Sequence, residues 1–401
     1  MLKHYGRKQQ SGKRPWILLA VAAILPIGLT IAAVFSVDMS AFTEKAALVS
    51  AMISMPEGSL SLLENRFSDK LDKEYYNGNE SEVAPYVEPF PEEENSDTSS
   101  SASSGASSSA PPRTPQKATS QDPSPASDNT HEVPEAYRGT LIQENMSGSG
   151  SNLLAYGEGL LRNYTQVPDS EVVSIMKQGL NIQLEDTKEP QVLIFHTHAT
   201  ESFEPYDSSA YDIRNTWRST DNTKNMVAVG NALAKELQDA GIGVLHDTTQ
   251  HDYPSYNGAY ERSAKTIQSY LDQYPSIKIA LDVHRDAIQR EEKLIVKPVV
   301  EIDGKKAAQL MIITGSDDGT MNVPKWRENL RFAASLQDAI EQDYPQLTRP
   351  IFFCYRKYNM DKTTGSLLLE VGASANTLEE SIYTAHMVGK SLAKLLTENN
   401  K

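Results

Sequence analysis

Residues 192–198 of this chain, Val-Leu-Ile-Phe-His-Thr-His, form an apolar run that ends in two imidazoles, and Glu201 follows just after them. Two distant stretches have the same design: residues 279–284 (Ile-Ala-Leu-Asp-Val-His) and residues 366–370 (Ser-Leu-Leu-Leu-Glu). Apolar runs of this length predict buried strands, and ligands of open α/β sheets collect at the carboxyl ends of the strands. If the three strands are neighbours, imidazoles and carboxylates converge there, as in a zinc hydrolase site.

Strands and helices alternate around these stretches from residue 190 onward. The pattern predicts helices over 220–241, 260–275, 328–344 and from 378 onward, and further strands over 242–246, 351–355 and 367–371. The first of these helices has Asp221 or Asn222 as its candidate cap. Residues 293–303 and 307–314 alternate like a hairpin turned at 303–304 (Asp-Gly). Together these elements predict an α/β domain with a mainly parallel sheet flanked by helices.

The N-terminal residues predict a membrane anchor. Residues 16–37 carry no charge and are long enough to cross a hydrocarbon core of roughly 30 Å. A cleavable signal peptide is the alternative, but its apolar core is usually about 7–15 residues and ends in a small-x-small site. The preceding basic residues are Lys3, Arg7, Lys8, Lys13 and Arg14. The positive-inside rule therefore predicts a cytoplasmic tail over 1–15, a transmembrane helix over 16–37 and an extracytoplasmic remainder.

The next part of the chain separates this anchor from a globular domain. Residues 38–76 form a juxtamembrane segment with two short apolar stretches, which serves as a spacer or a docking surface. Residues 77–150 are rich in Ser, Pro and Glu, and we expect them to be a disordered linker because they bury too little apolar surface to fold. The catalytic domain is expected over 151–401, with its core from about residue 186.

Charge and cysteine content exclude several classes of protein. The net charge of −15 argues against a nucleic-acid binder, because phosphate backbones require clustered Lys and Arg. The one cysteine, Cys354, leaves no intramolecular disulfide. Because Cys354 lies in an apolar, strand-like stretch, we expect a buried structural thiol there and not a nucleophile.

The first motif offers more ligands than one zinc ion needs. His196 and His198 are two residues apart, so in a strand both side chains point the same way. His196 is better fixed by the strand and ranks slightly ahead, while His198 is either a ligand or an orienting neighbour. Glu201 or Glu204 completes a His₂Glu set, and Glu201 is preferred because it is closer to the strand end.

The other two motifs supply a ligand and a base. His284 ends a strand too apolar to lie on the surface, and Asp282 can accept the other N–H of its ring. Arg285 is a candidate substrate-binding residue or a loop charge. Glu370 within a buried strand is costly unless it is paired or used, so it is expected to be the general base. The structural alternative is a salt bridge from Glu370 to Arg285 or Arg356.

In this order the three motifs resemble those of the zinc-dependent N-acetylmuramoyl-L-alanine amidases of bacterial cell walls. Residues 283–287 (Val-His-Arg-Asp-Ala) match the family's second histidine motif, and 370–376 (Glu-Val-Gly-Ala-Ser-Ala-Asn) resemble its catalytic glutamate motif. The first motif departs from the usual Gly-His-Gly, and Glu201 is closer in sequence than the family's glutamate. By this resemblance Glu370 is catalytic, and Asn376 joins Arg285 as a substrate-binding candidate.

The variant first motif, the anchor and the Ser/Pro-rich spacer resemble the stage II sporulation protein P family of endospore formers. The resemblance implies an amidase that removes stem peptides from glycan strands and an endopeptidase on peptide cross-links. It also implies a place at the sporulation septum during engulfment, with the stage II sporulation proteins D and M as partners. None of these partners is visible in the residues themselves.

The sequence thus predicts a membrane-anchored zinc hydrolase of peptidoglycan amide bonds, with Zn²⁺ held by His196 or His198, Glu201 and His284. Two alternatives remain open at this point. One is a non-catalytic wall-binding scaffold with an amidase-like fold. The other is a metal-dependent deacetylase or carboxypeptidase acting on wall sugars or peptides.

Overall fold

The computed structural model describes residues 133–150 and 152–398. The predicted cytoplasmic tail, membrane anchor, juxtamembrane segment and most of the linker lie outside the described residues. Among the residues described, no helix combines the length and apolar character needed to cross a bilayer.

The described residues form strands, α-helices and one short 3₁₀ helix. The strands are β1 (Arg138–Glu144), β2 (Leu153–Tyr156), β3 (Gly159–Asn163), β4 (Val192–Phe195), β5 (Ala210–Asp212), β6 (Val244–His246), β7 (Ile279–Asp286), β8 (Gln289–Glu291), β9 (Leu294–Ile302), β10 (Lys305–Ala308), β11 (Leu310–Gly315), β12 (Ile351–Cys354) and β13 (Gly365–Ala373). The helices are η1 (Glu135–Tyr137), α4 (Asp169–Met176), α5 (Met226–Asp239), α6 (Ala259–Gln273), α7 (Trp326–Asp343) and α8 (Leu378–Glu398).

The larger sheet has eight strands in the order β2-β3-β12-β11-β13-β7-β4-β6. The four strands β13, β7, β4 and β6 pair in parallel, whereas β11 runs antiparallel to β13 and β2 antiparallel to β3. The expected mainly parallel sheet is therefore wrong, because this sheet is mixed. The parallel run is the part that holds the three predicted motifs.

A second, smaller sheet has the order β10-β9-β1-β5, with β8 also paired to β9. It is mixed as well, since β1 is parallel to β9 and antiparallel to β5. β1 lies within the expected linker, so the folded part extends further toward the N-terminus than its composition suggested. Leu141 of β1 is 3% exposed and packs with Tyr211 and Trp217, which gives this short strand a core of its own.

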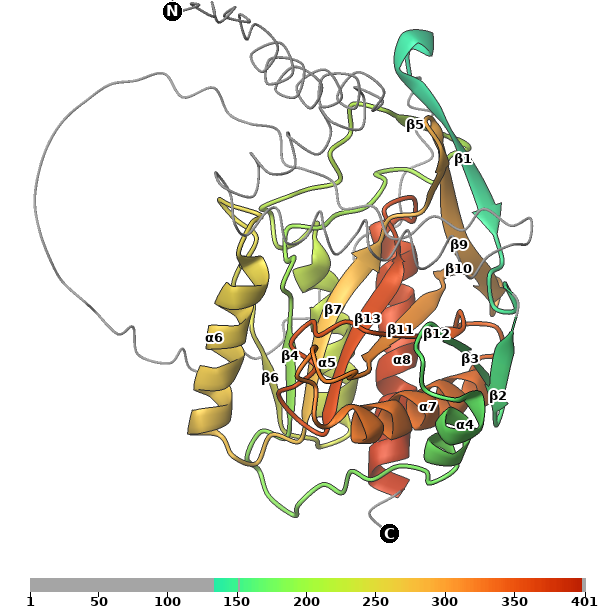
Figure 1. The fold of residues 1–401 in the computed structure, drawn as a ribbon. Helices are drawn as coiled ribbons and strands as arrows, with labels where there is room; N and C mark the ends of the chain where they lie inside the picture. Colours follow the sequence, from blue (N-terminus) through green and yellow to red (C-terminus); the bar gives the residue numbers. More distant parts are fainter. Residues whose placement is uncertain (1–132, 151, 399–401) are drawn as a thin grey trace, which may run out of the picture. The chain divides into compact units, whose positions relative to one another are not determined.

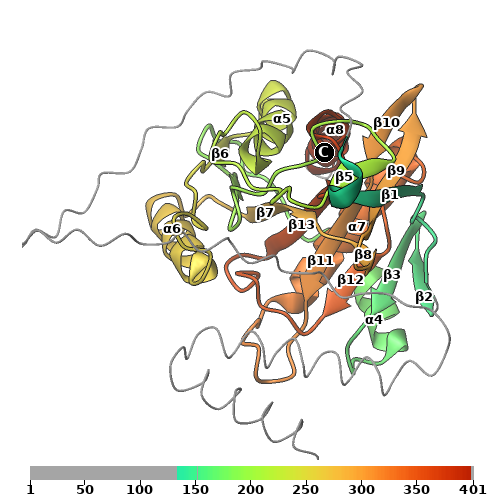
Figure 2. The same cartoon turned by 90° about the horizontal axis from the view of Figure 1, so that it is seen from above.

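Helices cover both faces of the parallel strands (Figures 1 and 2). Successive side chains of a strand point to opposite faces, and β4 follows this rule. Val192 and Ile194 join the large core that contains α5, α7 and α8, while Leu193 and Phe195 pack toward α6. Because both faces of β4 are buried, its sequence is continuously apolar and not alternating.

Two boundaries differ from the predictions in ways that matter for the site. β4 ends at Phe195, so His196 and His198 lie in the turn beyond the strand. Helix α5 starts at Met226, where the Asn225 side chain accepts a hydrogen bond from the Val227 N–H, and not at the expected Asp221 or Asn222 cap. Residues 199–225 consequently form a long segment, irregular except for the short strand β5, which we call the strap.

The predicted hairpin at 303–304 is present, but only in part. β9 and β10 pair antiparallel across that turn, with Lys305 opposite Ile302. β11, which was expected to continue the hairpin, instead joins the larger sheet between β12 and β13. The chain passes from one sheet to the other at Gln309, whose backbone N–H donates to the Pro298 carbonyl.

Candidate active site

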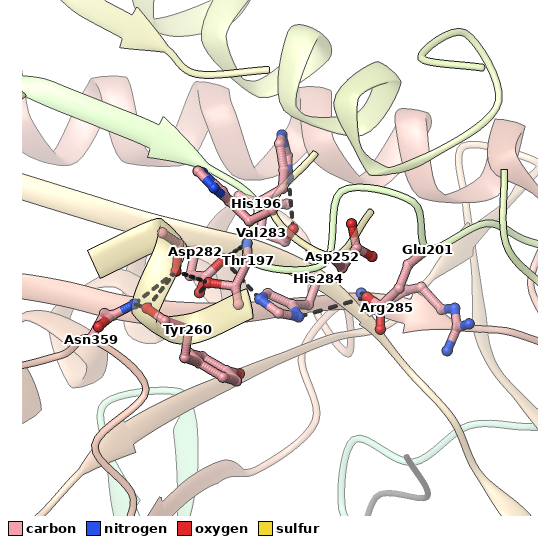
Figure 3. A network of polar contacts seen from close by, with 12 residues as sticks. His196, Thr197, Glu201, Asp252, Tyr260, Asp282, Val283, His284, Arg285 and Asn359 are labelled. Carbon is pink, nitrogen blue, oxygen red and sulfur yellow. Dashed lines mark hydrogen bonds and ion pairs between the residues drawn. The ribbon is translucent and has the colours of Figure 1, made fainter. Parts of the chain in front are cut away.

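The three motifs lie side by side on β4, β7 and β13, toward their carboxyl ends, and Figure 3 shows the residues of the first two. Phe195 pairs with Asp282 across β4 and β7, and Glu370 pairs with His284 across β13 and β7. The four side chains of His198, Glu201, His284 and Glu370 are each between 3% and 7% exposed. The candidate site is therefore a buried polar cluster in the parallel part of the sheet.

His198 lies against His284. Their rings are 5.2 Å apart between centroids and nearly perpendicular. The His198 ring also stacks on Tyr256 at 4.5 Å and meets the edge of Tyr260 at 5.4 Å. Its Nδ1 is buried and has no hydrogen-bond partner. Burial, followed by His284 and nearby arginines, holds the His198 pKa well below its usual range, so this imidazole is neutral with an unused lone pair or N–H.

His196 lies apart from this cluster, as Figure 3 shows. Its Nδ1 donates to the Val283 carbonyl at 2.7 Å, which leaves Nε2 as an acceptor for His246 Nε2 at 2.8 Å. Burial lowers the pKa of His196 to about 4 and that of His246 to about 3, so both are neutral. The sequence ranked His196 slightly ahead of His198 as the ligand, whereas the structure places His198, and not His196, beside His284.

His284 sits between two carboxylates. Its Nε2 is 2.7 Å from Asp282 Oδ1, and its Nδ1 is 3.6 Å from Glu201 Oε2. Burial alone lowers the His284 pKa, but the negative charges of Asp282, Glu201 and Glu370 outweigh it and raise the pKa to about 9. The carboxylates around His284 therefore favour its protonated, positively charged form.

Asp282 is held in place by the turn after β4. The Thr197 N–H donates to its Oδ1 at 2.8 Å, and the Thr197 hydroxyl donates to its Oδ2 at 2.6 Å. Asp282 in turn fixes the His284 ring with Nδ1 toward Glu201. A carboxylate that orients a histidine in this way is typical of metal-binding histidines in proteins.

Glu370 is a buried carboxyl without an ion-pair partner among the described residues. It is 7% exposed, and its Oε2 accepts no hydrogen bond. The arginine that lies near it, Arg349, instead pairs with Asp286 at 2.6 Å. Burial, reinforced by the charge of Asp286, raises the Glu370 pKa to about 8. The salt bridges to Arg285 or Arg356 that would have made Glu370 structural are not among its contacts.

The two candidate substrate-binding residues are built into the fold. Arg285 is 4% exposed, and its guanidinium donates to the carbonyls of Ser202 and Trp217 in the strap. Asn376 is fully buried, donates to Glu380 and the Pro298 carbonyl, and accepts the Ala373 N–H. The side-chain amide of Asn376 therefore bonds within the fold through both its oxygen and its nitrogen, and its substrate-binding role stays a prediction.

Glu204, the alternative to Glu201 as third ligand, points elsewhere. Its Oε1 accepts from the Trp217 indole at 2.5 Å and from Asn215 at 3.2 Å. Glu201 is the carboxylate that reaches the site, where its Oε2 also accepts the backbone N–H of Arg285 at 3.2 Å.

Sequence reasoning missed four residues that surround these groups: Arg218, Asp252, Tyr256 and Tyr260. Arg218 lies in the strap, Asp252 and Tyr256 lie in the loop before α6, and Tyr260 lies in the first turn of α6. No motif marks them as site residues, because loops and the first turn of α6 bring them to the site from segments that are distant in sequence.

The donor types fit zinc, which takes His nitrogen and carboxylate oxygen at about 2.0–2.2 Å in tetrahedral sites. The fit rests on the orphaned His198 Nδ1 and on the His284–Glu201 pair, whose 3.6 Å separation exceeds a hydrogen bond. Within residues 133–150 and 152–398, no three His, Cys, Asp or Glu side chains already lie in mutual coordinating reach. Glu201 and His284 are thus paired, and the His198 ring packs against His284.

A sequence model of one family, described as stage II sporulation protein P (SpoIIP), matches residues 59–393. A curated relative, stage II sporulation protein P of Bacillus subtilis (strain 168), is 26% identical over 221 residues, which are 52% of this chain and 52% of the relative. The chain therefore aligns with about half the length of this relative.

Solved structures of N-acetylmuramoyl-L-alanine amidases show a weaker similarity. AmiC2 of Nostoc punctiforme is 12% identical with a TM-score of 0.32, and the match covers 54% of this chain and 98% of AmiC2. The CwlD amidase of Clostridioides difficile, solved in complex with the GerS lipoprotein, is 11% identical with a TM-score of 0.33, covering 52% and 99%. TM-scores of this size are too low to establish a common fold.

Proposed function

Because the chain belongs to the stage II sporulation protein P family, we propose that it is a peptidoglycan hydrolase of sporulating cells. Its substrate bond is the amide between N-acetylmuramic acid and the stem peptide. The family name supports the link to sporulation, and the curated relative carries the same name. The reaction type is inferred from the site and from the motif resemblance at His284 and Glu370.

One observation carries the proposal: Glu370 is a buried carboxyl without a partner on Oε2, and it lies opposite His284 where β13 and β7 pair in parallel. A buried carboxylate that structure does not use is costly to keep. A general base needs this environment, because burial raises its pKa toward the working pH. We assign Glu370 to take a proton from the attacking water and to pass it to the leaving amine.

The remaining side chains of the cluster are proposed to bind the metal ion and to orient its ligands. His198, Glu201 and His284 are the proposed zinc-binding residues, with Asp282 fixing the His284 ring through Nε2. A bound zinc ion supplies Lewis acidity toward the scissile carbonyl and lowers the pKa of the attacking water. Tyr256 and Tyr260 pack on the His198 ring, which restricts its rotation and limits the access of bulk water.

Further parts of the proposal concern the whole protein. We include endopeptidase activity on peptide cross-links, an N-terminal anchor over 16–37 and an extracytoplasmic catalytic domain. The stage II sporulation proteins D and M are the proposed partners. The motif resemblance and the charge pattern of the N-terminus support these statements.

The test is digestion of purified peptidoglycan by the full chain, with and without a chelator, followed by mass spectrometry of the products. We expect released stem peptides, loss of release with the chelator, and loss of release in Glu370→Ala while zinc binding persists. Full activity of Glu370→Ala contradicts the assignment. Products that lack only acetate identify a deacetylase, and a protein with neither products nor stoichiometric zinc is a scaffold.

A further inference from the structure

A buried arginine lies between Glu201 and a second carboxylate, Asp252. The Arg218 side chain is 9% exposed and that of Asp252 is 0% exposed. One guanidinium nitrogen, Arg218 Nη1, is 3.2 Å from Asp252 Oδ2 and 3.8 Å from Glu201 Oε1. Arg218 therefore makes a hydrogen bond to Asp252 and only a looser ionic contact with Glu201.

Asp252 is fixed by the residue that precedes Glu201. The Thr200 N–H lies 3.2 Å from each oxygen of Asp252, and the Thr200 hydroxyl donates to Oδ2 at 2.6 Å. These bonds tie the loop before α6 to the start of the strap. A backbone bridge holds Arg218 opposite Glu201, and its guanidinium is hydrogen-bonded to Asp252, a carboxylate that does not itself reach His284.

Arg218 also touches the other side of the cluster. Its guanidinium lies over the Tyr256 ring, 5.3 Å from the centroid, and Tyr256 stacks on His198 with an angle of 6° between the rings. Arg218 is consequently in contact with Glu201 directly and with His198 through one aromatic ring. Buried ion pairs add little net stability compared with apolar packing, so stability alone is a weak reason for this arrangement.

A guanidinium competes with a metal ion for the same carboxylate, because both are cations that bind its oxygens. If Arg218 paired fully with Glu201, a cation at Glu201 would first have to displace it. The geometry shows the opposite arrangement: Arg218 Nη1 lies closer to Asp252 than to Glu201. Glu201 keeps Oε2 directed toward His284 and shares only Oε1 with Arg218.

We propose that Asp252 holds Arg218 away from full pairing with Glu201 and thereby keeps the Glu201 carboxylate available to zinc. Arg218 and Asp252 are positioning residues in this scheme, and neither binds the ion. The inference rests on the proposed function, since it takes His198, Glu201 and His284 as the zinc-binding residues. It adds that the zinc affinity of the site is controlled by a carboxylate outside that set.

The test is a double-mutant cycle on the zinc dissociation constant of the full chain, measured by competition with a chromophoric chelator. Asp252→Asn frees Arg218 to pair with Glu201, and we expect zinc binding to weaken about tenfold, within the usual range of coupling between neighbouring residues. Arg218→Gln removes the competitor, and we expect tighter binding. In the Arg218→Gln background, Asp252→Asn should then weaken binding by less than about twofold.

Arg262→Gln is the matched control. Arg262 donates to the carbonyls of His251, Ser255 and Asn257, so it holds the same loop with the same charge but has no bond to Glu201. Asp252→Asn should still weaken zinc binding about tenfold in that background. If Arg218→Gln does not fold, Arg218→Lys replaces it; its shorter side chain should at least halve the effect of Asp252→Asn.

The outcomes separate the two proposals. An equal loss of affinity from Asp252→Asn in all three backgrounds means that Asp252 acts through its charge or through loop structure alone, and it overturns the inference while leaving the zinc hydrolase intact. A wild-type protein that binds no zinc overturns the proposed function, and the inference fails with it.

Discussion

Glu370 lies directly beside His284 across the parallel pairing of β13 and β7, and one oxygen of its buried carboxyl has no hydrogen-bond partner. The register is kept up to this pair and shifts immediately after it, at the irregularity between Glu370 and Ala373. Regular pairing therefore holds Glu370 and His284 level with each other along the two strands. Beyond Glu370, the pairing of β13 with β7 becomes irregular.

Replacing Glu370 by Gln should separate catalysis from stability. We expect hydrolysis of peptidoglycan to fall by about 10² to 10⁴, the usual contribution of a general base. The melting temperature should not decrease, because the amide removes a buried, unpaired carboxyl. Product release and thermal unfolding measured on one preparation check both statements. Glu185→Gln, at an exposed carboxylate paired with Lys278, is the control and should leave both unchanged.

His196 and His198 should respond differently to alanine substitution. His198→Ala removes the imidazole beside His284, so we expect zinc affinity to fall by at least about tenfold. His196→Ala removes the bonds to Val283 and His246, so we expect a loss of about 2–3 kcal/mol of unfolding free energy with zinc affinity nearly unchanged. Zinc titration and urea unfolding of both variants check this. A loss of zinc in His196→Ala alone would reverse the assignment.

Gly230 in α5 leaves room for the two buried imidazoles. A Cβ atom at this position would lie 2.5 Å from His246 Nε2 and 2.6 Å from His196 Nε2. Gly-to-Ala changes inside helices usually stabilise by roughly 0.5–1 kcal/mol, but here we expect Gly230→Ala to destabilise by about 1–3 kcal/mol through overpacking. Chemical denaturation measures the change. Gly148→Ala, where nothing lies within 4 Å of the added atom, should be close to neutral.

Glu204 should make stability depend on pH. Burial raises its pKa from 4.5 to about 7, although the Trp217 and Asn215 hydrogen bonds act in the other direction. The folded protein therefore holds a proton that the unfolded chain releases above pH 4.5, and the free energy of unfolding falls as the pH rises from about 4.5 to about 7.

Glu204→Gln keeps an acceptor for Trp217 and removes this titration. We expect the variant to match wild type near pH 4.5 and to exceed it above pH 7 by up to about 3 kcal/mol, at about 1.4 kcal/mol per pKa unit. Unfolding free energies measured between pH 4.5 and pH 8 give the comparison. A constant difference across that range would contradict the assignment of the titration to Glu204.

Much of the domain could be predicted from local sequence. The apolar runs at 192, 279 and 366 are strands, and they are neighbours in the order β13-β7-β4. The helices that follow them have the expected 3.6-residue spacing, because each buries one apolar face against the sheet. Hydrophobic periodicity is a local signal, so it locates elements well.

The direction of the remaining strands could not be predicted in this way. β11 was assigned to a hairpin, yet it pairs with β12 and β13 in the larger sheet. Its residues Leu310–Gly315 are all buried, which fits either arrangement. Which sheet a buried strand joins, and between which neighbours, depends on contacts with residues far away along the chain. No local pattern contains that information.

Local sequence was enough to identify three buried strands that carry or precede His and Glu donors, because an apolar run followed by His or Glu is a local property. Tertiary structure decided which of those donors meet. β4 ends one residue before His196, so the strand rule that placed both imidazoles on one side does not apply beyond Phe195. The turn sends His196 toward His246 and His198 toward His284. Likewise Arg218 and Asp252 reach Glu201 only because long-range packing folds the strap and the loop before α6 against it.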